Sequence, residues 1–134
     1  MDRILIVDDE FLIRYTLEEG LKDRGYDAYS AATVEEGLEF VRKYHPGVLL
    51  LDNLLENSVG MDEIVNFKNA DEELQVIMMT AYGSVSQAVE ATKRGAYDYI
   101  LKPFDVDEID MLIKRCLEQK RNRDSLVFLK GDVP

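Results

Sequence analysis

Side chains suited to phosphate chemistry follow four apolar segments of this chain. Asp8 and Asp9 come after the first segment, Asp52 after the second, Thr80 after the third and Lys102 after the last. In an open parallel α/β sheet, the carboxyl ends of the strands line one edge, where ligands bind. We therefore expect these residues, although distant in sequence, to form one site.

The three carboxylates of this set indicate a metal ion. Asp8, Asp9 and Asp52 close together would repel one another and raise at least one pKa unless a cation neutralised them. Magnesium takes oxygen ligands and typically uses one or two carboxylates together with phosphate oxygens. No cysteine or histidine is near these residues in the sequence, which argues against zinc. The sequence therefore predicts a Mg²⁺ site.

Each of these residues also has a simpler explanation when it is taken alone. Asp8, Asp9 and Asp52 could cap the helices that follow them. Lys102 could be a solvated surface amine, and Thr80 an ordinary hydroxyl at a strand end. The functional interpretation depends on finding all of them at the same edge of one sheet.

Three continuous apolar runs predict buried strands. They lie at residues 4–7, 48–51 and 76–79, and none alternates with polar residues. This pattern is typical of parallel strands that helices cover on both faces. Between the runs, apolar residues recur at helical spacing. The first helix is expected to end near Gly25, and a short strand to follow at 26–31.

Three helix starts carry capping-box patterns, in which two side chains three residues apart satisfy unpaired backbone N–H groups. The pairs are Thr33 with Glu36, Ser84 with Gln87, and Asp105 with Glu108. We expect five strands alternating with five helices. That alternation favours an α/β fold with a doubly wound parallel sheet and right-handed crossovers.

The composition limits the kinds of protein that could carry such a site. The chain of 134 residues has the length of one domain. Its net charge of −11 argues against direct binding to nucleic acid. No run approaches the roughly 20 apolar residues of a membrane span, and the N-terminus lacks a secretion pattern. Cys116, the single cysteine, cannot form an intramolecular disulfide. We expect a cytoplasmic protein.

The strand-end motifs resemble those of receiver domains of bacterial two-component response regulators. They are ILIVDDE at residues 4–10, LLLD at 49–52, TAYG at 80–83 and KPF at 102–104. The resemblance extends over about Arg3 to Gln119 and implies a flavodoxin-like (βα)5 fold with strand order 2-1-3-4-5. The domain expected from it covers residues 1–123, and residues 124–134 would be a tail or the start of a linker to an output domain.

The resemblance assigns a task to each residue of the site. Asp52 would be the phosphoacceptor, attacking a phosphohistidine of a sensor kinase. Asp9 would bind Mg²⁺ directly and Asp8 mainly through water, and the backbone carbonyl of Leu54 would complete the protein ligands. Lys102 would neutralise charge on the phosphoryl oxygens. Such a protein catalyses only its own phosphorylation and slow autodephosphorylation.

The resemblance also implies a switch. The phosphoryl group would draw in the Thr80 hydroxyl, and the space left would admit the aromatic ring of Tyr99. The changed surface would comprise the fourth helix, the fifth strand and the fifth helix, and a homodimer could form through these two helices. A cis bond between Lys102 and Pro103 would aim the lysine into the site.

One segment departs from the family pattern. After Asp52 the family usually has a short turn with a proline and a glycine, whereas residues 53–62 are longer and lack the proline. Glu56 in this loop could turn toward the metal or toward Lys102, or remain solvated.

Residues 83–99 look most like receivers of the NtrC-like subgroup, which are usually followed by an AAA+ ATPase that activates sigma-54 RNA polymerase and by a DNA-binding domain. No Walker motif is present here. We therefore expect a phosphorylation-activated switch in transcription regulation, separated from its output domain.

Two other classes of protein could use similar residues. A haloacid dehalogenase-like phosphatase also combines an aspartate nucleophile with Mg²⁺, but it would need an aspartate two residues further on, where this chain has Leu54. A pseudo-receiver that only binds partners is disfavoured because the five residues of the site are all present.

Overall fold

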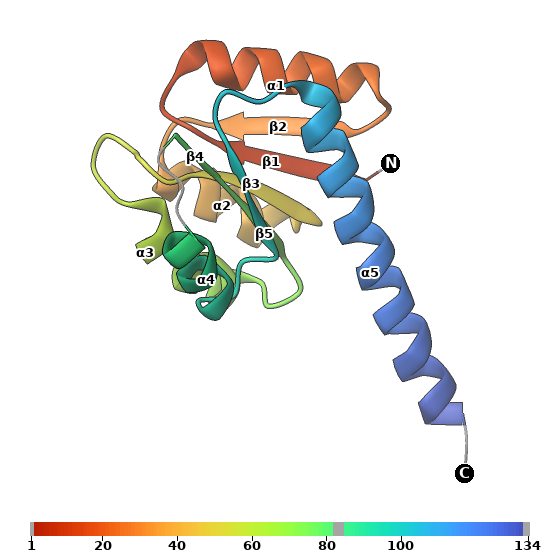
Figure 1. Cartoon of the computed structure of the whole chain (residues 1–134). Coiled ribbons are helices and arrows are strands. Elements are labelled where there is room, and N and C mark those ends of the chain that lie inside the picture. The colour runs from red at the N-terminus through yellow and green to blue at the C-terminus, as the bar shows by residue number, and fades with distance from the viewer. Residues whose placement is uncertain (1, 82–84, 133–134) are drawn as a thin grey trace.

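The computed structural model describes the backbone of residues 2–81 and 85–132, and the side chains of these ranges up to residue 123. In this part of the chain, five strands alternate with five helices, as predicted (Figure 1). The elements are β1 (Arg3–Val7), α1 (Phe11–Asp23), β2 (Asp27–Ala31), α2 (Val34–Tyr44), β3 (Val48–Asp52), α3 (Gly60–Ala70), β4 (Gln75–Thr80), α4 (Val85–Lys93), β5 (Asp98–Leu101) and α5 (Val106–Asp132).

The strands form one parallel sheet in the order β2-β1-β3-β4-β5, which confirms the predicted flavodoxin-like topology. The register aligns the carboxyl ends of the central strands. Val7 pairs with Leu51, and Thr80 pairs with Leu101. The residues that end or follow these strands therefore lie side by side at one edge of the sheet.

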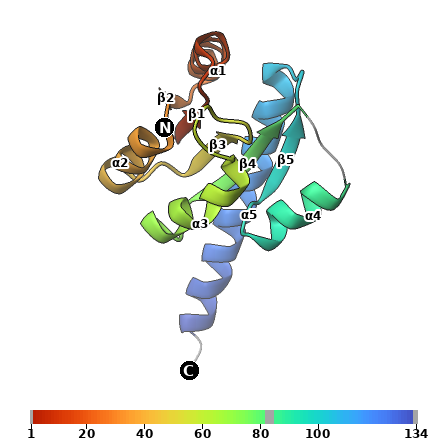
Figure 2. The same cartoon turned by 90° about the vertical axis from the view of Figure 1, so that its left-hand side faces the viewer.

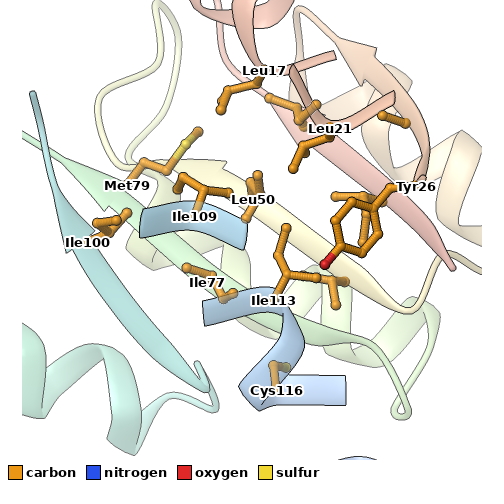
Figure 3. Packing of buried hydrophobic residues seen from close by; sticks show 14 of the residues in the cluster. Leu17, Leu21, Tyr26, Leu50, Ile77, Met79, Ile100, Ile109, Ile113 and Cys116 are labelled. Carbon is orange, nitrogen blue, oxygen red and sulfur yellow. The ribbon is translucent and has the colours of Figure 1, made fainter. Parts of the chain in front are cut away.

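Helices cover both faces of the sheet, as the continuous apolar strands require. Figures 1 and 2 show α1 and α5 on one face, and α2, α3 and α4 on the other. Alternate strand residues serve the two layers: Ile4 and Ile6 pack toward α1 and α5, whereas Leu5 and Val7 pack toward the other three helices. Figure 3 shows the first of these two cores, with Ile109 and Ile113 of α5 lying over Leu50 and Ile77.

Two of the predicted helix starts are capped by side chains. The Thr33 hydroxyl accepts a hydrogen bond from the backbone N–H of Glu36, and the Asp105 carboxylate accepts one from Glu108. The predicted cap at Ser84 lies outside the described residues. The first helix ends before Gly25, where a φ of +90° favours glycine and reverses the chain into β2.

The last helix is longer than the predicted domain. Its residues 124–132 continue α5 past the boundary placed at 123, and Figure 1 shows α5 running on beyond the sheet. A domain boundary near residue 123 remains a prediction. Cys116 packs in the core between α5 and the sheet, and burial raises the pKa of its thiol to about 11.

None of the helices in the described ranges combines the length and apolar character needed to cross a membrane.

Candidate functional site

The predicted chemical residues meet at the carboxyl edge of the sheet. Asp8 and Asp9 follow β1, Asp52 and Thr80 are the last residues of β3 and β4, and Lys102 follows β5. Asp8, Asp52 and Thr80 are only 0%, 4% and 6% exposed. A buried carboxylate is costly unless it is paired or coordinates a cation, so this edge needs compensating positive charge.

Lys102 supplies part of that charge. Its Nζ lies 3.2 Å from Asp8 Oδ2 and 3.2 Å from Asp52 Oδ1. The backbone N–H of Lys102 donates to the carbonyl of Thr80 at 2.8 Å, which fixes the start of this segment against β4. The peptide bond between Lys102 and Pro103 is cis. One ammonium thus bridges two carboxylates from different strands.

The three aspartates also fit a metal ion. Oxygen atoms of Asp8, Asp9 and Asp52 all lie within 4.8 Å of one another. A cluster made of carboxylate oxygens is the donor set that hard divalent cations prefer. These side chains could therefore hold a cation together.

The electrostatics of the site change the acidity of its groups. Burial, and next the negative charge of Asp8, raise the pKa of Asp52 to about 6, while Lys102 and the backbone N–H of Leu54 oppose this shift. Burial acts to lower the pKa of Lys102, but the carboxylates of Asp8 and Asp52 outweigh it, so the pKa is raised. Asp52 is therefore an anion at neutral pH, although an unfavourable one, and added positive charge would stabilise it.

Asp8 is held in place by a residue that the sequence analysis missed. Arg14 of α1 donates from Nη1 to the backbone carbonyl of Asp8 at 2.8 Å. The Asp8 carboxylate accepts a hydrogen bond from the N–H of Glu10 at 2.9 Å, so it also supports the turn into α1. The capping interpretation of Asp8 and its role in the site are thus compatible. The sequence signal for Arg14 would have been a cation in the first turns of the helix after Asp8.

The loop after Asp52 is closed by its own backbone. Leu54 and Val59 form an antiparallel bridge, and the N–H of Leu55 donates to the carbonyl of Ser58 at 3.0 Å. Glu56 at its tip is exposed, and among the described residues the group found close enough to share an ion consists of the three aspartates. A direct role of Glu56, and the Leu54 carbonyl as a ligand, remain predictions.

Thr80 and Tyr99, the two predicted switch residues, line the same small cavity. Its volume is about 10 Å³, and Asn53, Met61 and Ala91 contribute to its wall. Tyr99 is half-buried on β5. The cavity lies between the carboxyl end of β4 and α4, which contributes Ala91 to its wall.

The chain belongs to the family of response regulator receiver domains, whose model matches residues 4–114. Receiver domains are phosphorylation-activated signalling domains of two-component systems rather than catalysts acting on other substrates. The phosphatase alternative is therefore not favoured.

Relatives and solved structures agree with this assignment. The chain is 38% identical over 121 residues to sporulation initiation phosphotransferase F of Bacillus subtilis, covering 90% of this chain and 98% of that protein. It is 36% identical over 129 residues to the nitrogen assimilation regulatory protein NtrX of Azorhizobium caulinodans, covering 95% of this chain but 28% of NtrX. The chain therefore spans about a quarter of that longer regulator.

The solution structure of the beryllofluoride-activated NtrC4 receiver domain dimer superimposes with a TM-score of 0.84 and 34% sequence identity, covering 90% of this chain and 99% of that one. Similarity to NtrX and NtrC4 supports the predicted NtrC-like subgroup.

Proposed function

We propose that Asp52 accepts a phosphoryl group from a phosphohistidine of a sensor histidine kinase, and that the resulting phosphoprotein controls an output domain in transcription. The observation that carries the proposal is the position of Asp52. Its buried carboxylate lies 3.2 Å from the Lys102 ammonium and shares the cation-binding cluster with Asp8 and Asp9. In this proposal Asp8, Asp9, Asp52 and the Leu54 carbonyl hold Mg²⁺, which when bound supplies further positive charge to the phosphoryl oxygens.

The chain's own residues perform the transfer mainly by position and charge. An Asp52 oxygen attacks the phosphorus, the bond from phosphorus to the imidazole nitrogen breaks, and the carboxylate becomes an acyl phosphate. The transferring group carries its charge on the equatorial oxygens. Lys102 faces these oxygens because its ammonium already lies against Asp52, so little reorganisation is needed. The buried setting of Asp52 strengthens this attraction.

Phosphorylation would then act through Thr80 and Tyr99. The phosphoryl group adds about −1.5 to −2 charges and three acceptor oxygens, which can recruit the Thr80 hydroxyl. Tyr99 lines the same small cavity as Thr80, so a shift of Thr80 would change the surroundings of the Tyr99 ring. The surface that changes is formed by α4, β5 and α5, which we assign to contacts with the output domain or with a second copy of the chain.

The surroundings of the domain follow from its relatives and remain part of the proposal. An AAA+ ATPase and a DNA-binding domain would follow the receiver in the full-length protein. The location would be cytoplasmic, and the acyl phosphate would be lost by slow autodephosphorylation.

Incubation with Mg²⁺ and acetyl phosphate tests the phosphoacceptor. Intact-mass spectrometry should show one phosphoryl increment on the natural chain and none on Asp52→Asn. Asp107→Asn is the matched control, because it makes the same chemical change at an exposed carboxylate of α5. No increment on the natural chain, or an undiminished one on Asp52→Asn, would refute the assignment.

A further inference from the structure

The loop that departs from the family pattern is anchored at both ends next to Asp52. Its first residue, Asn53, is a polar residue with only 9% of its surface exposed. The loop ends at Val59, sooner than the predicted bound at residue 62, because Gly60 is already the first residue of α3. Asn53 and Gly60 bond directly, because the N–H of Gly60 donates to the Asn53 carbonyl at 2.8 Å. The two ends of the loop thus meet beside the phosphoacceptor.

Asn53 is tied to two different elements. Its backbone N–H donates to the carbonyl of Met79 on β4 at 2.9 Å. Its side-chain Oδ1 accepts a hydrogen bond from the N–H of Met61, in the first turn of α3, at 3.0 Å. The N–H groups of a first helical turn have no partner within the helix, so this bond meets a need of α3 and fixes its start. Asn53 therefore holds α3 and β4 in register with Asp52.

Gly60 allows a close approach that no other residue could make. A Cβ at this position would overlap the Asp52 carbonyl oxygen and would lie 3.0 Å from Asn53 Cα. The start of α3 therefore packs directly on the main chain of the phosphoacceptor. Without a side chain at residue 60, the two backbones can contact each other.

This packing reaches the reactive carboxylate through Leu54. The backbone N–H of Leu54 interacts with the Asp52 side chain, and the bridge from Leu54 to Val59 holds this peptide in the closed loop. Any shift of the loop would move both the donor to Asp52 and the Leu54 carbonyl proposed as a metal ligand. The usual proline turn is missing here, so the loop needs another source of rigidity.

We propose that Asn53 and Gly60 are positioning residues for phosphoryl transfer, which together fix the main chain around Asp52 in place of the proline turn. The inference rests on the proposed function of Asp52. Neither residue needs to touch the phosphoryl group. They act by keeping the Asp52 carboxylate and the Leu54 peptide in the orientation that in-line attack requires, where a displacement of about 1 Å can cost roughly 100-fold in rate.

The test measures the rate of phosphorylation by acetyl phosphate in Mg²⁺ over a range of donor concentrations. Asn53→Ala and Gly60→Ala should each lower the maximal rate by roughly 10-fold or more, with less than about a twofold change in the half-saturating donor concentration. Asn53→Asp keeps the oxygen that accepts from Met61 but buries a further carboxylate, so it should recover part of the rate. A purely structural role would instead lower thermal stability without this selective loss and rescue.

Two controls match the variants. Asn66→Ala removes an exposed asparagine of α3. Gly47→Ala adds a Cβ that would make only an ordinary 3.6 Å contact with Leu117. Both should react at the natural rate. If Gly60→Ala does not fold, as judged by circular dichroism, the inference is tested by Asn53→Ala and by the recovery of rate in Asn53→Asp.

Maximal rates for Asn53→Ala within twofold of the natural chain would overturn the inference. A natural chain that takes no phosphoryl group would instead refute the proposed function itself, so the two failures are distinguishable.

Discussion

The Lys102 ammonium lies 3.2 Å from the Asp52 carboxylate. We infer two successive tasks for the lysine. In the resting protein it compensates a buried carboxylate, and during transfer it would face the phosphoryl oxygens. Because the same carboxylate cluster suits a divalent cation, the lysine and a bound cation would partly replace one another in balancing the carboxylate charge.

Replacing Lys102 with methionine should therefore make stability depend on magnesium. Without the ammonium, two buried carboxylates face each other unpaired, and removal of one partner from a buried ion pair typically costs about 3–5 kcal/mol. Lys102 keeps 17% of its side chain exposed, so we expect a smaller loss, on the order of 1–3 kcal/mol. Urea unfolding in EDTA and in millimolar Mg²⁺ measures it. Magnesium should stabilise Lys102→Met more than the natural chain, and equal stabilisation of both would contradict this account.

The raised pKa of Asp52 predicts a pH dependence of stability in the absence of magnesium. A carboxyl whose pKa rises from 3.8 in the unfolded chain to about 6 in the folded one binds its proton more tightly when folded. Stability is then lost as the pH rises from about 4 to 6. Asparagine at this position does not titrate. The free energy of unfolding of Asp52→Asn should therefore rise relative to that of the natural chain between about pH 4 and 6, by an amount on the order of 2–3 kcal/mol.

Urea unfolding at several pH values in EDTA measures the difference between Asp52→Asn and the natural chain. A constant difference between pH 4 and 7 would mean that burial and Asp8 do not perturb Asp52 as the structure indicates.

The sheet and the composition of the site were predictable because their signals are local in sequence. Continuous apolar runs identify strands buried on both faces, and the residues that follow them must meet at one sheet edge. This reasoning was enough to predict that Asp52 and Lys102 lie close together. It could not predict that Lys102 also bonds Asp8, since that contact depends on how the lysine side chain crosses from β5 to β1.

The loop after Asp52 escaped prediction for a different reason. Its order comes from backbone contacts between Asn53 and Met79, and between Asn53 and Gly60, which leave no pattern in the sequence. Arg14 was missed similarly, since it bonds a backbone carbonyl rather than a charged group. The extension of α5 past residue 123 was missed because the apolar residues 126–129 did not follow a clear helical period.

Thr80→Val should separate phosphorylation from its consequence. Valine has nearly the same shape as threonine but lacks the hydroxyl that would bond the phosphoryl group. A hydrogen bond to a charged group contributes about 1.5–3 kcal/mol. The equilibrium constant for forming the activated conformation should therefore fall by roughly 10- to 100-fold. Phosphorylation by acetyl phosphate should continue. The proposed switch predicts that the natural chain self-associates in beryllofluoride, and sedimentation should show that Thr80→Val does so roughly 10- to 100-fold more weakly.

Tyr99→Ala gives the companion measurement to Thr80→Val, because it removes the ring from the other side of the same cavity. Undiminished beryllofluoride-induced association in Thr80→Val would exclude the Thr80 hydroxyl as the start of the switch.

Arg94 ties α4 to the start of α3 and should control local opening of α4. Its Nη1 lies 2.7 Å from Asp62 Oδ1, and its Nε lies 2.9 Å from Glu90 Oε1 within the same helical region. Asp62, the partner of Arg94 in α3, directly follows Met61, whose N–H donates a hydrogen bond to Asn53. Asp62→Ala should therefore loosen α4, whereas Glu90→Ala removes a partner of Arg94 without touching α3.

The pair is exposed, so Asp62→Ala should cost only about 0.2–1 kcal/mol of global stability. Hydrogen exchange of the amides of residues 85–93 measures the local effect. Exchange should quicken about two- to fivefold in Asp62→Ala and less in Glu90→Ala, because only the first variant disconnects α4 from α3. Equal acceleration in both variants would mean that Arg94 stabilises α4 only from within, and that the contact with α3 does not restrain the helix.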